Sequence, residues 1–229
     1  MQPCNHLHTK TSHIICKITH TNKKKQPKSC FIRIYFLPLH YQTNANMKFD
    51  IITEDERLWA VRYDGNTENA LYMLFEQWND VVGLREFFKA NINDLSSYFK
   101  ITDVNEAIYD TIEDSEKLQC LIMDLSPEAD LDRLFRPLEN SRIEEILLGK
   151  EKARLKENRK HASWLRIYAI KLEPGIYVIT GGAIKLTRTM QEREHTLLEL
   201  RKMEQVRRFL LDNDVIDKDA FTDYLSELS

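Results

Sequence analysis

Apolar and β-branched residues are concentrated in the last third of the chain, where their pattern predicts two strands. Residues 165–172 and 176–180 are rich in Ile, Val, Leu and Tyr, and the turn between them contains Pro and Gly. We therefore predict an antiparallel hairpin. Successive side chains of a strand point to opposite faces, so we expect Arg166 and Tyr168 on one face and Lys171 on the other.

Apolar residues at helical spacing predict most of the remaining elements. Predicted helices cover 68–91, with Gly83 as the weak point, 104–125, 191–211 and, shorter, 131–135 and 219–228. Two short strand-like runs, 48–53 and 57–63, precede them as another hairpin. Residues 150–161 are almost all charged, and we expect a solvated connection there. These elements predict an α+β fold, a small antiparallel sheet packed with several helices.

The first 46 residues differ in composition from the rest, and Met47 begins the regular pattern. They hold five of the seven His, three of the four Cys and seven Lys or Arg, but no Asp or Glu. We expect 1–46 to be an upstream extension or a disordered tail, and 47–229 to form a single domain. Residues 31–39 are apolar but include Arg33, and the Cys spacing lacks paired knuckles, so we predict neither a signal peptide nor a metal site.

Charge is strongly segregated although the formal net charge is only −3. Residues 47–149 contain ten basic and 23 acidic residues, a net charge of −13, whereas 150–208 contain 15 basic and seven acidic residues, a net charge of +8. Partner choice follows the local field, so the basic segment is expected to face a polyanion. With one Cys after Met47 and no apolar run of about 18 residues, we predict a cytoplasmic protein outside the membrane.

Cations and aromatic residues are interleaved in the basic segment, as at many sites that bind nucleic acid. The set comprises Lys160, His161, Trp164, Arg166, Tyr168, Lys171, Tyr177, Lys185, Arg188 and Arg193. Basic side chains neutralise phosphates while aromatic rings stack on unpaired bases, which is typical of single-stranded RNA recognition. We find no Walker, dinucleotide-binding or zinc-protease motif, and interpret Gly181-Gly182 as a bulge rather than a phosphate cradle. A merely solubilising rim of the sheet is the alternative.

The order of elements and two short motifs resemble the RelE/ParE superfamily of toxins, in particular its HigB-like members. The motifs are Pro137-Leu138 ahead of the strand with Arg166, and Lys185, Thr187 and Arg188 ahead of the long last helix. The resemblance implies a RelE-like core with helices on one face of the sheet, here with an enlarged acidic helical half. It also implies a bacterial toxin that cleaves mRNA, often on the ribosome, and that a cognate helix-turn-helix antitoxin protein holds inactive.

The resemblance further implies cleavage by the RNA's own 2′-hydroxyl, without a metal or another cofactor. The implied catalytic residues are Arg166, Tyr168, Lys185 and Arg188, and the implied nucleic-acid-binding residues are Lys160, His161, Lys171, Thr187 and Arg193. The arginines would stabilise the phosphate, and Lys185 with Tyr168 or His161 would transfer protons. Two alternatives stay open: a noncatalytic toxin-like protein that docks a partner through its basic face, and a gyrase-directed toxin of the same fold.

Overall fold

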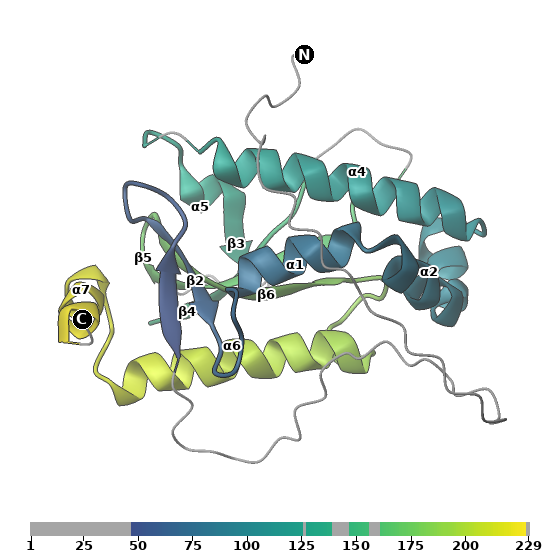
Figure 1. Ribbon diagram of the computed structural model, residues 1–229. Coiled ribbons are helices and arrows are strands. Elements are labelled where there is room, and N and C mark those ends of the chain that lie inside the picture. Colours follow the sequence, from purple (N-terminus) through teal and green to yellow (C-terminus); the bar gives the residue numbers. More distant parts are fainter. Residues whose placement is uncertain (1–46, 126, 139–146, 156–160, 228–229) are drawn as a thin grey trace, which may run out of the picture. The chain divides into compact units, whose positions relative to one another are not determined.

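The computed structural model describes residues 47–125, 127–138, 147–155 and 161–227. They belong to Tyr41–Ser229, one of two units into which the chain divides. The predicted extension at 1–46 lies outside the described residues and stays a prediction. The described part has an α+β fold, with a six-stranded, mostly antiparallel sheet and helices on both faces (Figure 1). The predicted α+β class is therefore confirmed and the RelE-like core stays a prediction, whereas the expectation of helices on one face is wrong.

The sheet has the strand order β1-β2-β6-β5-β4-β3. Its strands are β1 Lys48–Ile51, β2 Leu58–Arg62, β3 Phe135–Pro137, β4 Gly149–Ala153, β5 Leu165–Glu173 and β6 Ile176–Ile184. Strands β2 and β6 run parallel, and the other described neighbours pair antiparallel. Both predicted hairpins are confirmed, and β6 continues to Ile184 rather than ending at Thr180.

Strand β4 lies where the sequence predicts a solvated connection. It pairs with β5 and places Glu151 and Ala153 in buried positions, whereas Lys150 and Lys152 are half-buried. One of its two buried positions is a glutamate, so hydrophobic alternation does not reveal the strand. The prediction for the first part of 150–161 is therefore wrong.

Helices account for most of the remaining described residues. They are α1 Ala70–Asn79, α2 Val81–Ala90, α3 Ile92–Asp94, α4 Val104–Met123, α5 Leu131–Leu134, α6 Glu194–Asp212 and α7 Lys218–Glu227, with a π-helical turn at Leu95–Phe99. The break within the predicted helix 68–91 falls at Asp80 instead of Gly83. The Asp80 carboxylate accepts a hydrogen bond from the Val82 N–H and caps α2. Within the described ranges, no helix combines the length and apolar character that crossing a membrane requires.

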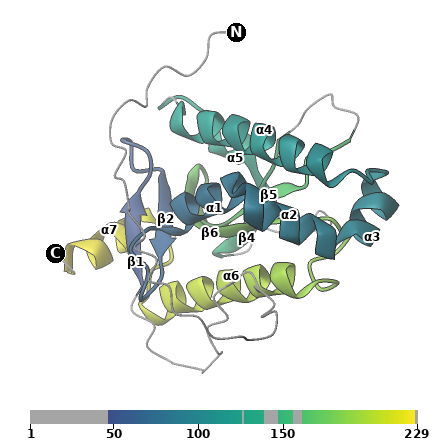
Figure 2. The same cartoon turned by 45° about the vertical axis from the view of Figure 1, so that its right-hand side comes forward.

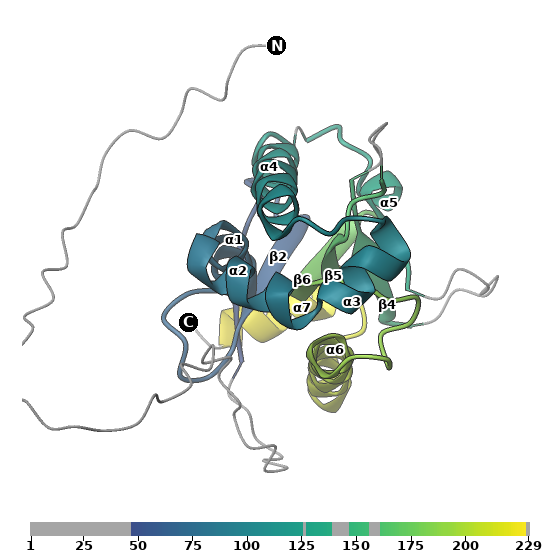
Figure 3. The same cartoon turned by 90° about the vertical axis from the view of Figure 1, so that its right-hand side faces the viewer.

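Two hydrophobic cores lie on opposite faces of the sheet. The first is under α1, α2 and α4 and contains Trp78 and Trp164; the second is under α6 and α7 and contains Tyr168 and Met203. Figure 1 and Figure 3 show α1 and α4 on one side of the sheet and α6 on the other, and Figure 2 shows α2 beyond the end of α1. Strand alternation therefore decides which core receives each side chain of β5.

The Gly181-Gly182 pair lets β6 pass close to its neighbours. The β5–β6 register shifts between Tyr168 and Ala169, so the predicted bulge is confirmed. A Cβ on Gly182 would collide with the backbone carbonyl oxygen of Arg166, and one on Gly181, whose φ is +153°, would collide with the Glu199 carboxylate. Gly182 requires glycine because its neighbour is backbone, whereas at Gly181 the positive φ favours glycine.

Candidate functional site

Four basic side chains converge at one end of the sheet, on the side that α6 covers. Lys152 belongs to β4, Arg154 follows it, Arg166 lies on β5, and Lys185 follows β6. We call these four residues the cationic cluster. Register explains the convergence, because Lys152 lies opposite Tyr168 and Arg166 opposite Ala183, and both pairs face α6.

Mutual repulsion in the cationic cluster is evident from the pKa values. Burial and then Arg154 lower the pKa of Arg166 to about 10, so it stays charged at neutral pH. Burial lowers the pKa of Lys152 and of Lys185, and Arg166 contributes to both shifts. Like charges held together favour an added anion.

Arg166 has no carboxylate partner among the described residues. Its NH1 group donates hydrogen bonds to the carbonyl oxygens of Ser163 at 2.6 Å and Leu165 at 2.7 Å. These bonds fix the guanidinium while leaving its other N–H groups for a ligand. The guanidinium is thus oriented for an anion without being neutralised.

The loop 185–193 joins the cationic cluster to α6 and is braced by its own polar groups. Lys185 Nζ donates to the carbonyl oxygens of Thr187 at 2.6 Å and Arg188 at 2.5 Å. The buried Thr187 hydroxyl donates to the Thr189 carbonyl at 3.0 Å. An ammonium has three donors, so Lys185 retains one for a ligand. The Arg188 side chain is exposed, and no residue of the described ranges pairs with it.

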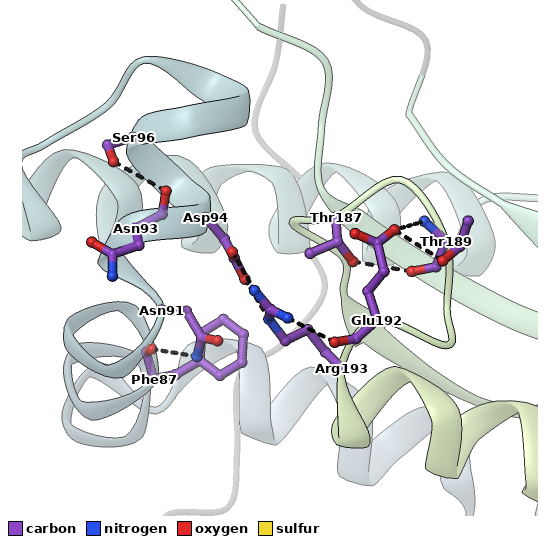
Figure 4. Close-up of polar contacts among 9 residues, drawn as sticks. All are labelled: Phe87, Asn91, Asn93, Asp94, Ser96, Thr187, Thr189, Glu192 and Arg193. Carbon is purple, nitrogen blue, oxygen red and sulfur yellow. Dashed lines mark hydrogen bonds and ion pairs between the residues drawn. The ribbon is translucent and has the colours of Figure 1, made fainter.

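Arg193 closes the other end of the loop through an ion pair with Asp94 of α3. Its Nε and NH2 donate to the two carboxylate oxygens at 2.6 and 2.5 Å, as Figure 4 shows. NH1 donates to the Glu192 carbonyl at 2.7 Å. Each guanidinium nitrogen thus already has a protein partner, and Arg193 anchors the loop instead of extending toward a ligand.

Tyr168 is fully buried under α6, and its hydroxyl has no hydrogen-bond partner within the described residues. Burial raises the pKa of Tyr168 well above its ordinary value. The prediction that Arg166 and Tyr168 share a face is confirmed, but the expectation that Tyr168 transfers a proton at the site is not met, because α6 covers its ring. A substrate has no access to Tyr168 while α6 is in place.

His161 and Lys171 lie on the other side of the sheet. The His161 ring stacks on Trp164 with 4.6 Å between centroids, and its Nε2 is 2.9 Å from Asp110 Oδ2 of α4. His161 is therefore packed rather than solvated, contrary to expectation. Lys171 pairs with Asp132 at 3.0 Å. The structure brings neither residue to the cationic cluster, and Lys160 lies outside the described residues.

Sequence reasoning missed Lys152 and Arg154, although a signal exists. Lys150, Lys152 and Arg154 recur at every second position, which is the period of one strand face. Lys150 pairs with Glu204 of α6 at 3.0 Å, so the row begins under the helix and ends in the cationic cluster.

Comparison with known protein families, with curated proteins and with solved structures gives no match in any of the three. The function is therefore inferred from the cationic cluster and the braced loop.

Proposed function

We propose that this protein binds single-stranded RNA through the cationic cluster and acts as a toxin-like, metal-independent endoribonuclease. The observation that carries the proposal is the convergence of Lys152, Arg154, Arg166 and Lys185 at one end of the sheet. A phosphate diester is the anion that such a group suits, because guanidinium groups grip two of its oxygens and never lose their charge near neutrality.

The distribution of acidic residues supports this assignment. Helix α4 carries Glu106, Asp110, Glu113 and Glu116, and it packs on the face of the sheet opposite α6. The sheet thus separates this acidic helix from the cationic cluster. An RNA strand approaching the cluster therefore avoids the strongest repulsion that the net charge of −13 over 47–149 would create.

The proposed cleavage needs charge stabilisation and a proton donor at the phosphate. The RNA 2′-hydroxyl releases its proton to solvent water and attacks phosphorus, the bond to the 5′-oxygen breaks, and a 2′,3′-cyclic phosphate forms. Arg166 and Arg154 stabilise the charge on the phosphate oxygens, and Lys185 donates a proton to the leaving oxygen. Its lowered pKa, caused by burial and by Arg166 and Lys152, favours that donation.

A noncatalytic toxin-like RNA-binding protein is the second candidate. It is favoured by the position of two of the three predicted proton-transfer residues, since Tyr168 is buried and His161 lies across the sheet. RNA is bound by the same cationic cluster in both candidates. They differ only in whether the strand is cut.

The test uses the full chain and a labelled single-stranded RNA in buffer containing a chelator. We expect binding that weakens steeply with salt, cleavage that leaves 2′,3′-cyclic phosphate ends, and growth arrest on expression in bacteria. Arg166→Gln should reduce cleavage by a factor of the order of 100 and relieve the arrest. The matched control is Arg201→Gln, an exposed arginine of α6 paired with Glu194, and it should change neither.

Each outcome separates the candidates. Binding without cleavage supports the noncatalytic protein. Growth arrest with intact RNA contradicts both candidates and indicates a protein target such as gyrase, and an absence of RNA binding at low salt overturns the proposal.

A further inference from the structure

Glu192 occupies an anion-binding position within the loop 185–193. Its Oε1 accepts hydrogen bonds from the Thr189 N–H at 2.6 Å and from the Thr189 hydroxyl at 2.9 Å, as Figure 4 shows. A backbone N–H beside a hydroxyl is a pair of donors that also suits a phosphate oxygen. The carboxylate thus holds a place that a phosphate can take.

Two cations act on the same carboxylate. The hydrogen bonds from Thr189 lower the pKa of Glu192 most, and the charges of Lys185 and Arg193 lower it further. Arg193 is already paired with Asp94, whereas Lys185 belongs to the cationic cluster. The positive charge of Lys185 therefore acts both in the cationic cluster and at the position that the Thr189 donors bind.

Access and position favour a ligand there. Thr189 and Glu192 are both exposed, so an anion from solvent reaches the two donors without unfolding the loop. Arg188, adjacent to Thr189 in sequence, is also exposed and has no partner in the described ranges. Arg188 is not among the charges that lower the pKa of Glu192, so Lys185 is the cation left for a ligand there.

We infer that the Thr189 N–H and hydroxyl, with Lys185, form a second phosphate-binding site, which the Glu192 carboxylate fills until RNA displaces it. This inference rests on the proposed function, because the phosphate belongs to the strand that the cationic cluster binds. Glu192 then acts as an internal competitor, and its removal strengthens binding instead of weakening it.

The first test compares RNA affinity of the full-length wild type with that of Glu192→Gln and Glu192→Ala. The glutamine is neutral but still accepts a hydrogen bond, whereas the alanine empties the site. We expect binding of a short labelled single-stranded RNA to tighten roughly two- to fivefold, the scale of one exposed charge interaction, with alanine at least as effective as glutamine.

The matched control is Glu194→Gln. Glu194 is also exposed and also loses one negative charge, but its carboxylate pairs with Arg201 at 3.2 Å and lies outside the Thr189 contacts. Equal tightening by Glu192→Gln and Glu194→Gln would reflect net charge alone and would overturn the inference. A thermal unfolding curve for each variant verifies that the fold is retained.

Inorganic phosphate separates this inference from the proposed function. We expect the Thr189 amide resonance to shift at lower phosphate concentration in Glu192→Ala than in the wild type. That shift without RNA binding supports the phosphate site and contradicts the RNA proposal. If phosphate shifts the Thr189 amide resonance in neither protein, the inference is wrong, because the contact between Thr189 and Glu192 then only stabilises the turn.

Discussion

Arg193 donates hydrogen bonds to both carboxylate oxygens of Asp94, and this contact joins residues 99 positions apart. Asp94 is only 8% exposed, so its charge depends on that one guanidinium for compensation. The pair ties α3 to the residue that precedes α6, and it therefore fixes the end of the loop 185–193.

Breaking this pair should loosen the loop. Arg193→Gln leaves the Asp94 carboxylate buried without its cation, so we expect the melting temperature to fall by several degrees and RNA affinity to fall with it. The double variant with Asp94→Asn should recover part of the melting temperature, because two amides can hydrogen-bond to each other. Thermal unfolding and RNA titration measure both effects. An unchanged melting temperature in Arg193→Gln would contradict a stabilising role for the ion pair between Arg193 and Asp94.

The local part of the fold was predictable from the sequence, and the long-range part was not. The alternation around Arg166 and the Pro-Gly turn predicted the β5–β6 hairpin correctly. Strands β2 and β6 pair in parallel although they are far apart in sequence, and no local pattern encodes such a pairing. Ile167 and Ile170 are both fully buried on opposite faces of β5, and an apolar run of this kind indicates a sheet covered on both sides.

The candidate site was predictable only in part for a similar reason. Arg166 and Lys185 stand out by charge among apolar neighbours, and the register brings them together. The environment of His161 depends on Asp110, which is 51 residues away, and on its stack against Trp164. Contacts of that kind arise only from tertiary packing, so charge and composition misplaced His161 beside the basic residues.

Tyr168→Phe should leave the proposed cleavage unchanged and preserve or raise stability. The hydroxyl is buried without a partner, so its removal abolishes a desolvation penalty of about 1 kcal/mol and creates almost no cavity. Chemical unfolding and the RNA cleavage assay measure the two effects. A loss of cleavage in a correctly folded Tyr168→Phe protein would show that α6 moves aside during the reaction, and would restore Tyr168 as a catalytic candidate.

Glu151 should make stability fall as pH rises. Burial raises its pKa to about 7 from an ordinary value of 4.5, while Lys171 opposes that shift and Asp132 adds to it. The folded protein thus holds this proton more tightly than the unfolded chain, so the free energy of unfolding decreases between pH 4.5 and about 7.

The glutamine in Glu151→Gln is neutral at every pH, so the free energy of unfolding of this variant should not show that decrease. We expect it to exceed the wild type in free energy of unfolding by about 3 kcal/mol above pH 7, at roughly 1.4 kcal/mol for each unit between the two pKa values, and to match it below pH 4.5. Denaturant titrations on either side of this window measure the difference. Glu76→Gln, an exposed change on α1, is the control and should follow the wild type throughout. If the free energy of unfolding of Glu151→Gln changes with pH as that of the wild type does, Glu151 is not a buried group that holds its proton in the folded state.

Arg154 is one of the two members of the cationic cluster that the sequence did not single out, and it offers a direct test of the register. Its charge acts first among neighbours on the pKa of Arg166, so both guanidinium groups should contact the same stretch of RNA backbone. Each phosphate contact with a single strand contributes roughly 0.7 to the slope of log affinity against log salt, because one condensed counterion is released. Arg154→Gln should therefore lower that slope by about 0.7, as Arg166→Gln does.

The control is Lys171→Gln. Lys171 lies on the opposite face of β5 and pairs with Asp132, so this variant should leave the slope unchanged. If Arg154→Gln and Lys171→Gln lower the salt slope equally, RNA affinity depends on the net charge of the protein, and the cationic cluster is not the binding site.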